Sequence, residues 1–238
     1  LGLDLAVGAH IWMPPNVAGF VGADHVAMVL ATGIAAQSRR VLALDIGTNT
    51  EITLAAGGSS AAIGRLWSCS TASGPVFEGA HIRDGMRAAP GAIERVRWLN
   101  GRLVYETIDD QPAVGICGSG ILDAVAALLS AGAVETTGRL KRDHPLVDRE
   151  DGEAGVTLAR PEDSAHGRAV RITRKDIHEV QLAKGAIRAG TELLLREAGL
   201  HAEDLDEIVI AGAFGAYIDI PGAVQVGIFP RLPGERFR

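Results

Sequence analysis

An aspartate at the end of an apolar run constrains this chain more than any other feature. Residues 41–46 (VLALDI) have the length of a strand and are apolar enough to be buried on both faces, except at the carboxylate of Asp45. The letters GTNT follow at once and predict a tight turn, and residues 51–55 (EITLA) predict a second strand. After a second turn, residues 61–68 predict a third strand. Three strands in such close succession imply an antiparallel meander.

The turn after the first strand has the composition of an anion-binding turn. Its backbone N–H groups and small side chains can point at a phosphate, while Asp45 can hold a hydrated Mg²⁺. The alternative is an ordinary β-turn in which Asp45 accepts backbone hydrogen bonds. The residues of the turn leave both interpretations open.

A second strand-to-turn motif lies near the end of the chain. Residues 207–211 (EIVIA) predict a buried strand, and Gly212 to Gly215 (GAFG) turn it into a helix. Glycine at a strand end lets a flat ring lie against the backbone, and the start of a helix attracts phosphate. A close crossing of helix and strand is the alternative, because glycine also permits that.

Two further segments of small residues are candidate loops. Residues 115–120 (GICGSG) open a predicted helix over 119–130, and they can cradle an anion or form a packing turn with Ser119 as the N-cap. They are not a Walker loop, because no Gly-Lys-Ser/Thr follows. Residues 69–75 (CSTASGP) can wrap a nucleotide, or Cys69 can ligate a metal shared with a partner chain. An ordinary loop with a buried thiol is the simpler reading of that segment.

The other predicted elements complete an α/β chain with a mixed sheet. A short helix within residues 20–37 should bury Val26, Val29, Leu30 and Ile34. The Asn100-Gly101 pair predicts a type I′ hairpin. A capping box at Thr173 should start a helix that ends near Ala198. Aromatic residues are scarce at 4% and glycine is abundant at 30 residues, which is typical of α/β enzymes and not of sandwiches.

Composition excludes several classes of function. The net charge is −6 and the basic residues are scattered, which argues against nucleic acid as a partner. No apolar run reaches the roughly 18 residues of a membrane span, and the first thirty residues lack a signal peptide's basic region. Two cysteines, Cys69 and Cys117, are too few for a disulfide framework or a four-thiolate cluster, so a cytoplasmic protein with reduced thiols is expected. The seven histidines form no metal-binding pair.

Taken in order, these segments resemble one family, the reductive activators of corrinoid-dependent methyltransferases. The matching strings are residues 14–24 (PPNVAGFVGAD), 45–49 (DIGTN), 69–80 (CSTASGPVFEGA), 85–88 (GMRA), 115–120 (GICGSG), 180–187 (VQLAKGAI) and 211–215 (AGAFG). The resemblance covers nearly the whole chain apart from residues 135–168, which are polar and predict a surface excursion.

The resemblance implies a function for the parent protein. Members of the family carry an amino-terminal [2Fe–2S] domain and a carboxy-terminal ATPase fold of the acetate and sugar kinase, heat-shock chaperone and actin superfamily. They use ATP to drive the reduction of cob(II)alamin to cob(I)alamin. The implied cofactors are ATP and Mg²⁺, and the implied partner is a corrinoid protein, while a homodimer is compatible with the sequence. This chain departs from the pattern because it lacks ferredoxin-type cysteines, so no iron–sulfur cluster is expected in it.

The superfamily fold has two ribonuclease-H-like lobes with phosphate-1, phosphate-2 and adenosine motifs. The turn at Asp45 is assigned to phosphate-2, because the residues before it are too few to build a lobe, and residues 211–215 then fall in the adenosine position. Residues 1–40 are expected to form an amino-terminal connecting segment, and residues 41–238 are expected to form one lobe. The resemblance implies that Asp45 is the catalytic and Mg²⁺-binding residue. The implied nucleotide-binding residues are Gly47, Thr48, Asn49, Thr50, Ser73, Gly74, Gly212, Ala213, Phe214 and Gly215, and Gly118, Ser119 and Gly120 form an anion or partner loop.

Two other functions remain open at this point. The chain could be a docking module that recognises a corrinoid protein without binding a nucleotide. It could also belong to the related activators of 2-hydroxyacyl-CoA dehydratases, which place a cluster cysteine after a similar meander.

Overall fold

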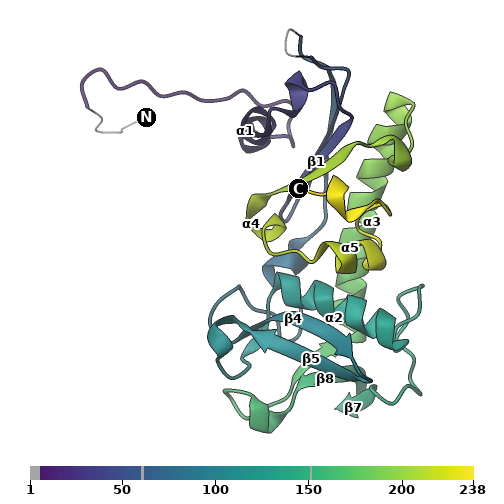
Figure 1. Cartoon of the computed structure of the whole chain (residues 1–238). Helices are drawn as coiled ribbons and strands as arrows, with labels where there is room; N and C mark the ends of the chain where they lie inside the picture. Colours follow the sequence, from purple (N-terminus) through teal and green to yellow (C-terminus); the bar gives the residue numbers. More distant parts are fainter. Residues whose placement is uncertain (1–5, 60–61, 151) are drawn as a thin grey trace.

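A four-stranded mixed sheet forms the first half of the molecule. The computed structural model describes residues 6–59, 62–150 and 152–238. The sheet has the order β10-β1-β2-β3, with β1 (Val41–Ile46), β2 (Thr50–Ala56), β3 (Arg65–Thr71) and β10 (Glu207–Ala211). Strands β1, β2 and β3 pair antiparallel and β1 pairs parallel with β10. The predicted meander is therefore confirmed (Figure 1).

Helices cover both faces of this sheet. Because side chains alternate along a strand, Leu42 and Leu44 join the main core, which includes the long helix α3 (Arg174–Ala198), while Val41 and Ala43 pack toward α1 (Ala23–Thr32) on the other face. Helix α1 belongs to residues 1–40, so the segment expected only to connect also covers the sheet. The predicted α/β class with a mixed sheet and helices on both faces is confirmed.

Three details of the first half differ from the predictions. Of the predicted stripe, Ile34 is buried and Val29 packs against the same core, but Leu30 is 72% exposed, and helix α1 buries His25 and Met28 instead. The buried imidazole is tolerated because its Nε2 lies 2.6 Å from the Thr53 hydroxyl oxygen on β2. Strand β3 runs from Arg65 to Thr71 and not over residues 61–68, of which residue 61 lies outside the described part. Cys69 is consequently a strand residue, and the loop after it is limited to residues 72–74.

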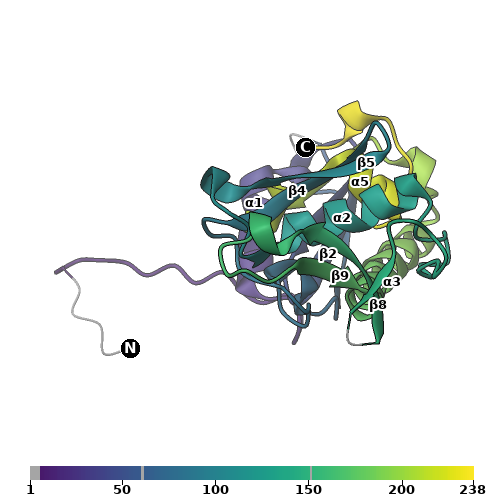
Figure 2. The same cartoon turned by 90° about the horizontal axis from the view of Figure 1, so that it is seen from below.

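The second half is built around α2 (Gly118–Ala131) and two three-stranded sheets. One sheet has the order β5-β4-β6, with β4 (Ala92–Leu99), β5 (Arg102–Thr107) and β6 (Gly115–Ile116). The other has the order β7-β8-β9, with β7 (Asp148–Glu150), β8 (Glu153–Ala159) and β9 (Val170–Thr173). Asn100 and Gly101 both have positive φ, at 50° and 79°, as the predicted type I′ hairpin requires. Figure 1 shows these strands below the first half, and in Figure 2, which is seen from below, they lie in front of it.

Residues 135–168, predicted as a surface excursion, contain β7 and β8. Val156 is 1% exposed and Leu158 is 8% exposed, and both belong to the main core. Strand β8 pairs with β9, so the long connection contributes a sheet.

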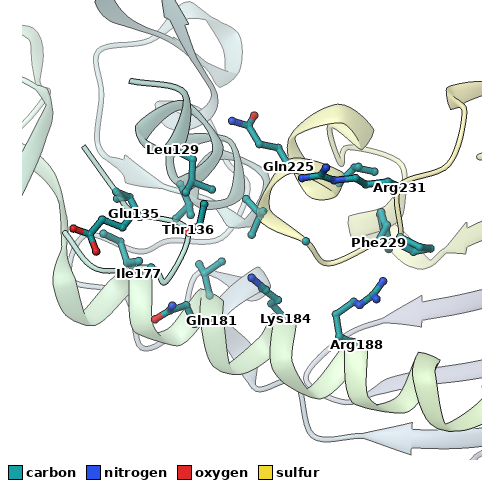
Figure 3. A pocket seen from close by; sticks show the side chains of 18 residues that line it. Leu129, Glu135, Thr136, Ile177, Gln181, Lys184, Arg188, Gln225, Phe229 and Arg231 are labelled. Carbon is teal, nitrogen blue, oxygen red and sulfur yellow. The ribbon is translucent and has the colours of Figure 1, made fainter. Parts of the chain in front are cut away.

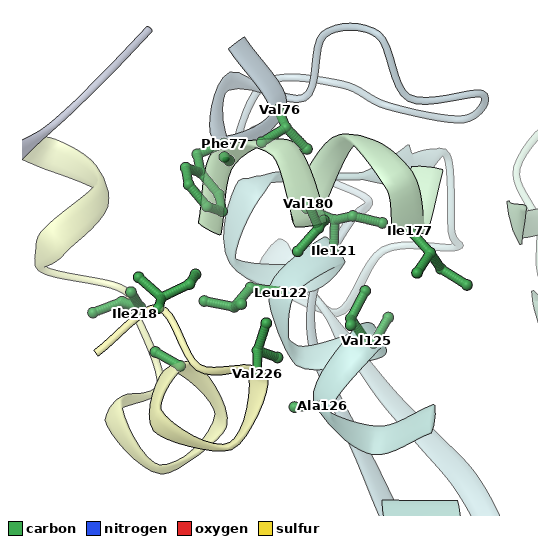
Figure 4. Close-up of a cluster of buried hydrophobic side chains, with 14 of the residues drawn as sticks. Val76, Phe77, Ile121, Leu122, Val125, Ala126, Ile177, Val180, Ile218 and Val226 are labelled. Atoms are coloured by element: carbon green, nitrogen blue, oxygen red, sulfur yellow. The ribbon is translucent and has the colours of Figure 1, made fainter. Parts of the chain in front are cut away.

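The long helix α3 ties the two halves together. Its amino terminus is held by the predicted capping box, in which Thr173 and Asp176 exchange hydrogen bonds, and its carboxyl end is Gly199 at φ 68°. Its 25 residues span about 37 Å. Val180 and Ile177 pack in one continuous core with residues of α2 such as Leu122 and Val125 (Figure 4).

The remaining helices are short. α4 (Gly212–Gly215) and α5 (Ile220–Val226) follow β10. The 3-10 helices are Ile34–Ala36, Pro75–Glu78, Ile108–Asp110, Pro161–Asp163, Ala202–Asp204 and Gly234–Arg236. Among the described residues, no helix is both long enough and apolar enough to cross a membrane.

Candidate functional site

The two strand-end motifs meet at the carboxyl ends of β1 and β10. These strands are parallel, with Asp45 opposite Ala211, so the next residue, Gly212, comes beside the aspartate. A Cβ at position 212 would lie only 2.6 Å from Asp45 Oδ1, and Gly212 has φ 84°. Glycine is therefore required at position 212 both by its backbone conformation and by the closeness of the carboxylate. More than 160 residues of sequence separate the two motifs that form this edge.

A cavity of about 640 Å³ opens at this edge, between the two halves of the molecule. This volume lies within the usual range for small-molecule sites. Of the residues assigned from the resemblance, Asp45, Gly118, Ser119, Gly212 and Phe214 line the cavity. The structure thus brings the end of β1, the start of α4 and the start of α2 to one space.

Hydrogen bonds from residues 73 and 74 support the turn after Asp45. The Ser73 hydroxyl donates to the Gly47 carbonyl at 3.1 Å, and its oxygen lies 2.7 Å from that of the Thr50 hydroxyl. The Gly74 N–H donates to the Thr48 carbonyl at 2.8 Å. Ser73 and Thr50 are buried, so they support the turn and do not face an open ligand space.

The other residues of the turn do not line the cavity. Gly47 and Asn49 close the turn through a backbone hydrogen bond of 3.0 Å, and neither lines the cavity. The exposed Thr48 hydroxyl donates to the Glu78 carboxylate, which does line it. Of residues 45–50, Asp45 and Ile46 are therefore the ones that line the cavity.

The start of α2 is shaped by packing as well as by its position. A Cβ at Gly118 would collide with the Phe77 carbonyl, and one at Gly120 with the Ile93 carbonyl. The N-cap is Cys117, without a side-chain cap, so the assignment of Ser119 as N-cap was wrong. Gly118 and Ser119 nevertheless line the cavity, and the first N–H groups of a helix have no partner within the helix.

Helix α4 carries the rest of the predicted adenosine motif. Phe214 stacks on Phe77, with ring centroids 4.7 Å apart and planes 20° from parallel. A Cβ at Gly215 would lie 2.9 Å from the Ile210 carbonyl oxygen, so the close helix–strand crossing explains that glycine. Ala213 lies in the same helical turn.

Several lining residues were not singled out from the sequence. Arg87, Glu78, Glu94 and Tyr217 contribute charge and polar groups to the cavity. Arg87 belongs to the GMRA string and Glu78 to residues 69–80, and both strings matched the family, so these two residues carried a signal. Glu94 and Tyr217 carry no motif, and only the packing of the two halves brings them to the site.

The surroundings of Asp45 are acidic and partly buried. Burial raises the pKa of Glu51, which is opposite Asp45 on β2, and the nearby Asp24 and Asp45 carboxylates act in the same direction. Burial lowers the pKa of His25, although the neighbouring Asp45 and Asp24 oppose this. Burial therefore disfavours the charged form of the His25 imidazole.

The structure offers little support for a metal held by Cys69. Burial raises the pKa of the Cys69 thiol, which disfavours the thiolate that metals bind. Within residues 6–59, 62–150 and 152–238, no three His, Cys, Asp or Glu side chains are grouped to hold a metal ion. Any ion at Asp45 would therefore need ligands from water, a bound molecule or another part of the parent protein.

A family match covers most of the chain and both of its halves. The family described as the C-terminal domain of RACo, the ASKHA domain, matches residues 39–238. The chain belongs to this family. The fold expected from the resemblance is thus confirmed by an independent comparison.

Relatives and a solved structure agree with this assignment. The chain is 40% identical to the corrinoid activation enzyme RamQ of Eubacterium limosum over 94% of its own length and 38% of the relative's. It is 32% identical to the [Co(II) methylated amine-specific corrinoid protein] reductase of Methanosarcina barkeri over 93% of this chain and 40% of the relative. A structure of a reductive activator for corrinoid, iron-sulfur protein superposes with a TM-score of 0.84 at 37% identity, covering 94% of this chain and 35% of that one. The chain therefore spans less than half the length of these proteins.

Proposed function

We propose that this chain is the nucleotide-binding part of an ATP-dependent activator that drives reduction of cob(II)alamin to cob(I)alamin in corrinoid methyltransferase systems. One observation carries the proposal: Asp45 and Gly212 lie against each other at the mouth of a cavity, at the ends of two adjacent parallel strands. In a chain of the ASKHA family, this arrangement supports the assignment of the two motifs to phosphate-2 and adenosine. Relatives named for corrinoid activation support the choice of reaction.

The residues around the cavity suit a magnesium nucleotide. Asp45 would hold Mg²⁺ through water, since Mg²⁺ retains several waters and takes only one or two carboxylates. The ion supplies positive charge that stabilises a transferring phosphoryl group. Arg87 and the start of α2 at Gly118 offer positive charge and free N–H groups to the phosphates. The backbone of α4, beginning at Gly212, would approach the adenosine.

Two loops would support the proposed nucleotide site. Gly47, Thr48, Asn49 and Thr50 would form the phosphate-2 turn, and hydrogen bonds from Ser73 and Gly74 hold that turn in place. Catalysis of phosphoryl transfer needs charge stabilisation and positioning from several sides. ATP hydrolysis is therefore assigned to the parent protein and not to this chain alone.

The proposed partner is a corrinoid protein of a methyltransferase system. An activator that reduces the cob(II) state should bind that state in preference to the others. Calorimetric titration of the intact parent with a corrinoid protein poised in each cobalt state tests this, and tighter binding of the cob(II) form is expected. Equal affinity for every state, or no binding at all, would contradict the activator role.

Nucleotide titration of the same parent separates the activator from a docking module. A docking module would bind the corrinoid protein without binding ATP. Saturable ATP binding that depends on Mg²⁺ is expected. Corrinoid-protein binding with no ATP binding would replace the activator proposal with the docking one.

A further inference from the structure

A second cavity lies at the other end of α2 from Asp45. It has a volume of about 350 Å³ and is enclosed by the carboxyl half of α2, the middle of α3 and the segment after α5. It shares no lining residue with the cavity at Asp45. On α2, Ser119 lines one cavity and Val125 is the nearest residue that lines the other, which separates them by about 9 Å along the helix. A ligand of this second cavity would therefore be distinct from the proposed nucleotide.

Three basic side chains converge on the second cavity. Lys184 and Arg188 rise from α3 toward the segment that carries Arg231 (Figure 3). Glu135 is the one acidic residue among those that line it. The Arg188 guanidinium is paired with Glu192, but for Lys184 and Arg231 no carboxylate lies within 4.0 Å in the described part of the chain. The cavity thus holds more positive charge than its own acidic groups balance.

This arrangement is unfavourable without an anion. Lys184 and Arg188 are one helical turn apart, where like charges destabilise a helix. Both side chains are half-buried, so they are less well screened by water than exposed charges would be. The chain as a whole has net charge −6, so the excess of basic groups here is local.

The uncharged lining adds hydrogen-bond donors and an apolar floor. Val180, Val226 and Phe229 are buried beneath the charges. Gln181 and Gln225 contribute side-chain amides, and each already donates one hydrogen bond that fixes its position. Gln181 donates to the Thr137 carbonyl at 2.7 Å, and Gln225 donates to the Ser130 hydroxyl at 2.8 Å. Past Gln181 the basic character continues in an adjoining hollow lined by Arg139, Arg174, Lys175 and His178.

We propose that the second cavity binds a phosphate group, either as free orthophosphate or as part of a small organic phosphate. Lys184 from α3 and Arg231 from the opposite wall would be its main charge partners, with Arg188 as the third. Basic groups from two walls match a tetrahedral dianion with oxygens in several directions better than a planar carboxylate. The bound phosphate would link α3 to the segment after α5.

A purely structural role for Lys184 makes a different prediction. A Cβ at Gly227, the residue that ends α5, would lie 3.4 Å from Lys184 Nζ, so the ammonium group is near the negative end of that helix. If this were its whole role, replacing Lys184 would lower stability and leave anion binding unchanged.

Pyrophosphate, titrated calorimetrically into the chain without Mg²⁺, is the first probe. Lys184→Met and Arg231→Met should each weaken binding by about tenfold or more, since each removes a charge-assisted hydrogen bond. Lys141→Met, at an exposed site that lines neither cavity, is the matched control because it also removes one positive charge. It should bind pyrophosphate as the unmodified chain does. Arg87→Met reports separately on pyrophosphate binding in the cavity at Asp45, and all four variants should keep the circular dichroism spectrum of the unmodified chain.

The possible results distinguish the proposed phosphate site from its alternatives. Loss of binding in Arg87→Met but not in Lys184→Met would place the anion at Asp45 and overturn the proposal, as would no pyrophosphate binding by the chain. Preference for a glutamate-rich peptide over pyrophosphate would overturn it too and assign the face to a protein partner. Titrations with orthophosphate and AMP then show whether the ligand is free phosphate or an organic phosphate. Equal affinities for the two identify free phosphate as the ligand. Tighter binding of AMP that is lost in Lys184→Met identifies an organic phosphate.

Discussion

Asp123 is a buried carboxylate whose cost to the fold can be measured. It lies on α2 with 5% of its surface exposed. Its Oδ2 accepts the N–H of Val96 at 3.4 Å and lies 3.7 Å from Arg95 Nη1, while its Oδ1 has no hydrogen-bond partner in the described part of the chain. Burial raises the pKa of Asp123 from 3.8 to about 6, although Arg95 acts in the opposite direction.

The size and sign of the effect follow from this pKa. A shift of about two units corresponds to about 3 kcal/mol between the two protonation states. Because the folded pKa is above the unfolded one, the penalty is absent below about pH 4 and complete above about pH 6. The folded state therefore loses up to about 3 kcal/mol of stability from this group as the pH rises through that window.

Asp123→Asn keeps the shape of the side chain and removes its charge. At about pH 8 the variant should be up to about 3 kcal/mol more stable than the unmodified chain, and at about pH 4 the two should be nearly equal. Urea unfolding of both proteins at the two pH values measures the difference, with Asp143→Asn at an exposed site as the control. A gap that does not change with pH, or a less stable variant at about pH 8, would refute the reasoning.

Three further predictions concern the site and the cysteines. Gly212→Ala should lower the free energy of unfolding by about 1–2 kcal/mol, because the residue has a left-handed backbone conformation. It should also weaken ATP binding by the parent, because the new methyl group meets Asp45. Gly199→Ala is the control: it also has a left-handed backbone but open space around it, so only stability should fall. Unchanged ATP binding in Gly212→Ala would count against the site. This chain alone should bind ATP at about millimolar affinity or weaker and show no hydrolysis, and full turnover would mean that it contains a complete site. It should purify without colour, because only Cys69 and Cys117 can supply thiolates; stoichiometric iron and sulfide, including a cluster shared through Cys69 across a dimer, would favour the dehydratase-activator alternative.

The sequence predicted the fold well where local patterns decide structure. The strands around Asp45, the hairpin at Asn100 and the capping box at Thr173 all depend on neighbours in the chain, and all are present. His25 was missed on the buried face of α1, because it is buried through a hydrogen bond to Thr53, twenty-eight residues away, which no helical periodicity reveals.

The second half was harder to predict for the same physical reason. Strand β8 lies in a polar stretch, and its Val156 and Leu158 are buried only because β9 and the main core cover them. The apolar residues of β8 alternate over only a few positions within the long and charged stretch of residues 135–168, so the strand was not predicted.

The sequence predicted the motifs of the candidate site but not how they come together in space. Each glycine turn was ambiguous by itself, and the parallel register of β1 and β10 is what puts Asp45 beside Gly212. Charged residues without a motif, such as Glu94, reach the cavity only through the packing of the two halves. Packing also explains Gly118 and Gly215, whose missing side chains make room for backbone.

Steady-state ATP turnover by the full-length parent carrying Asp45→Asn tests the central assignment most directly. If Asp45 positions Mg²⁺ and its water, turnover should fall by roughly 10² or more. The loss of stability should be small, because asparagine can keep the local hydrogen bonds, and Asp143→Asn should turn over ATP like the unmodified parent. Wild-type turnover in Asp45→Asn would contradict the phosphate-2 assignment and leave Asp45 as an ordinary turn residue.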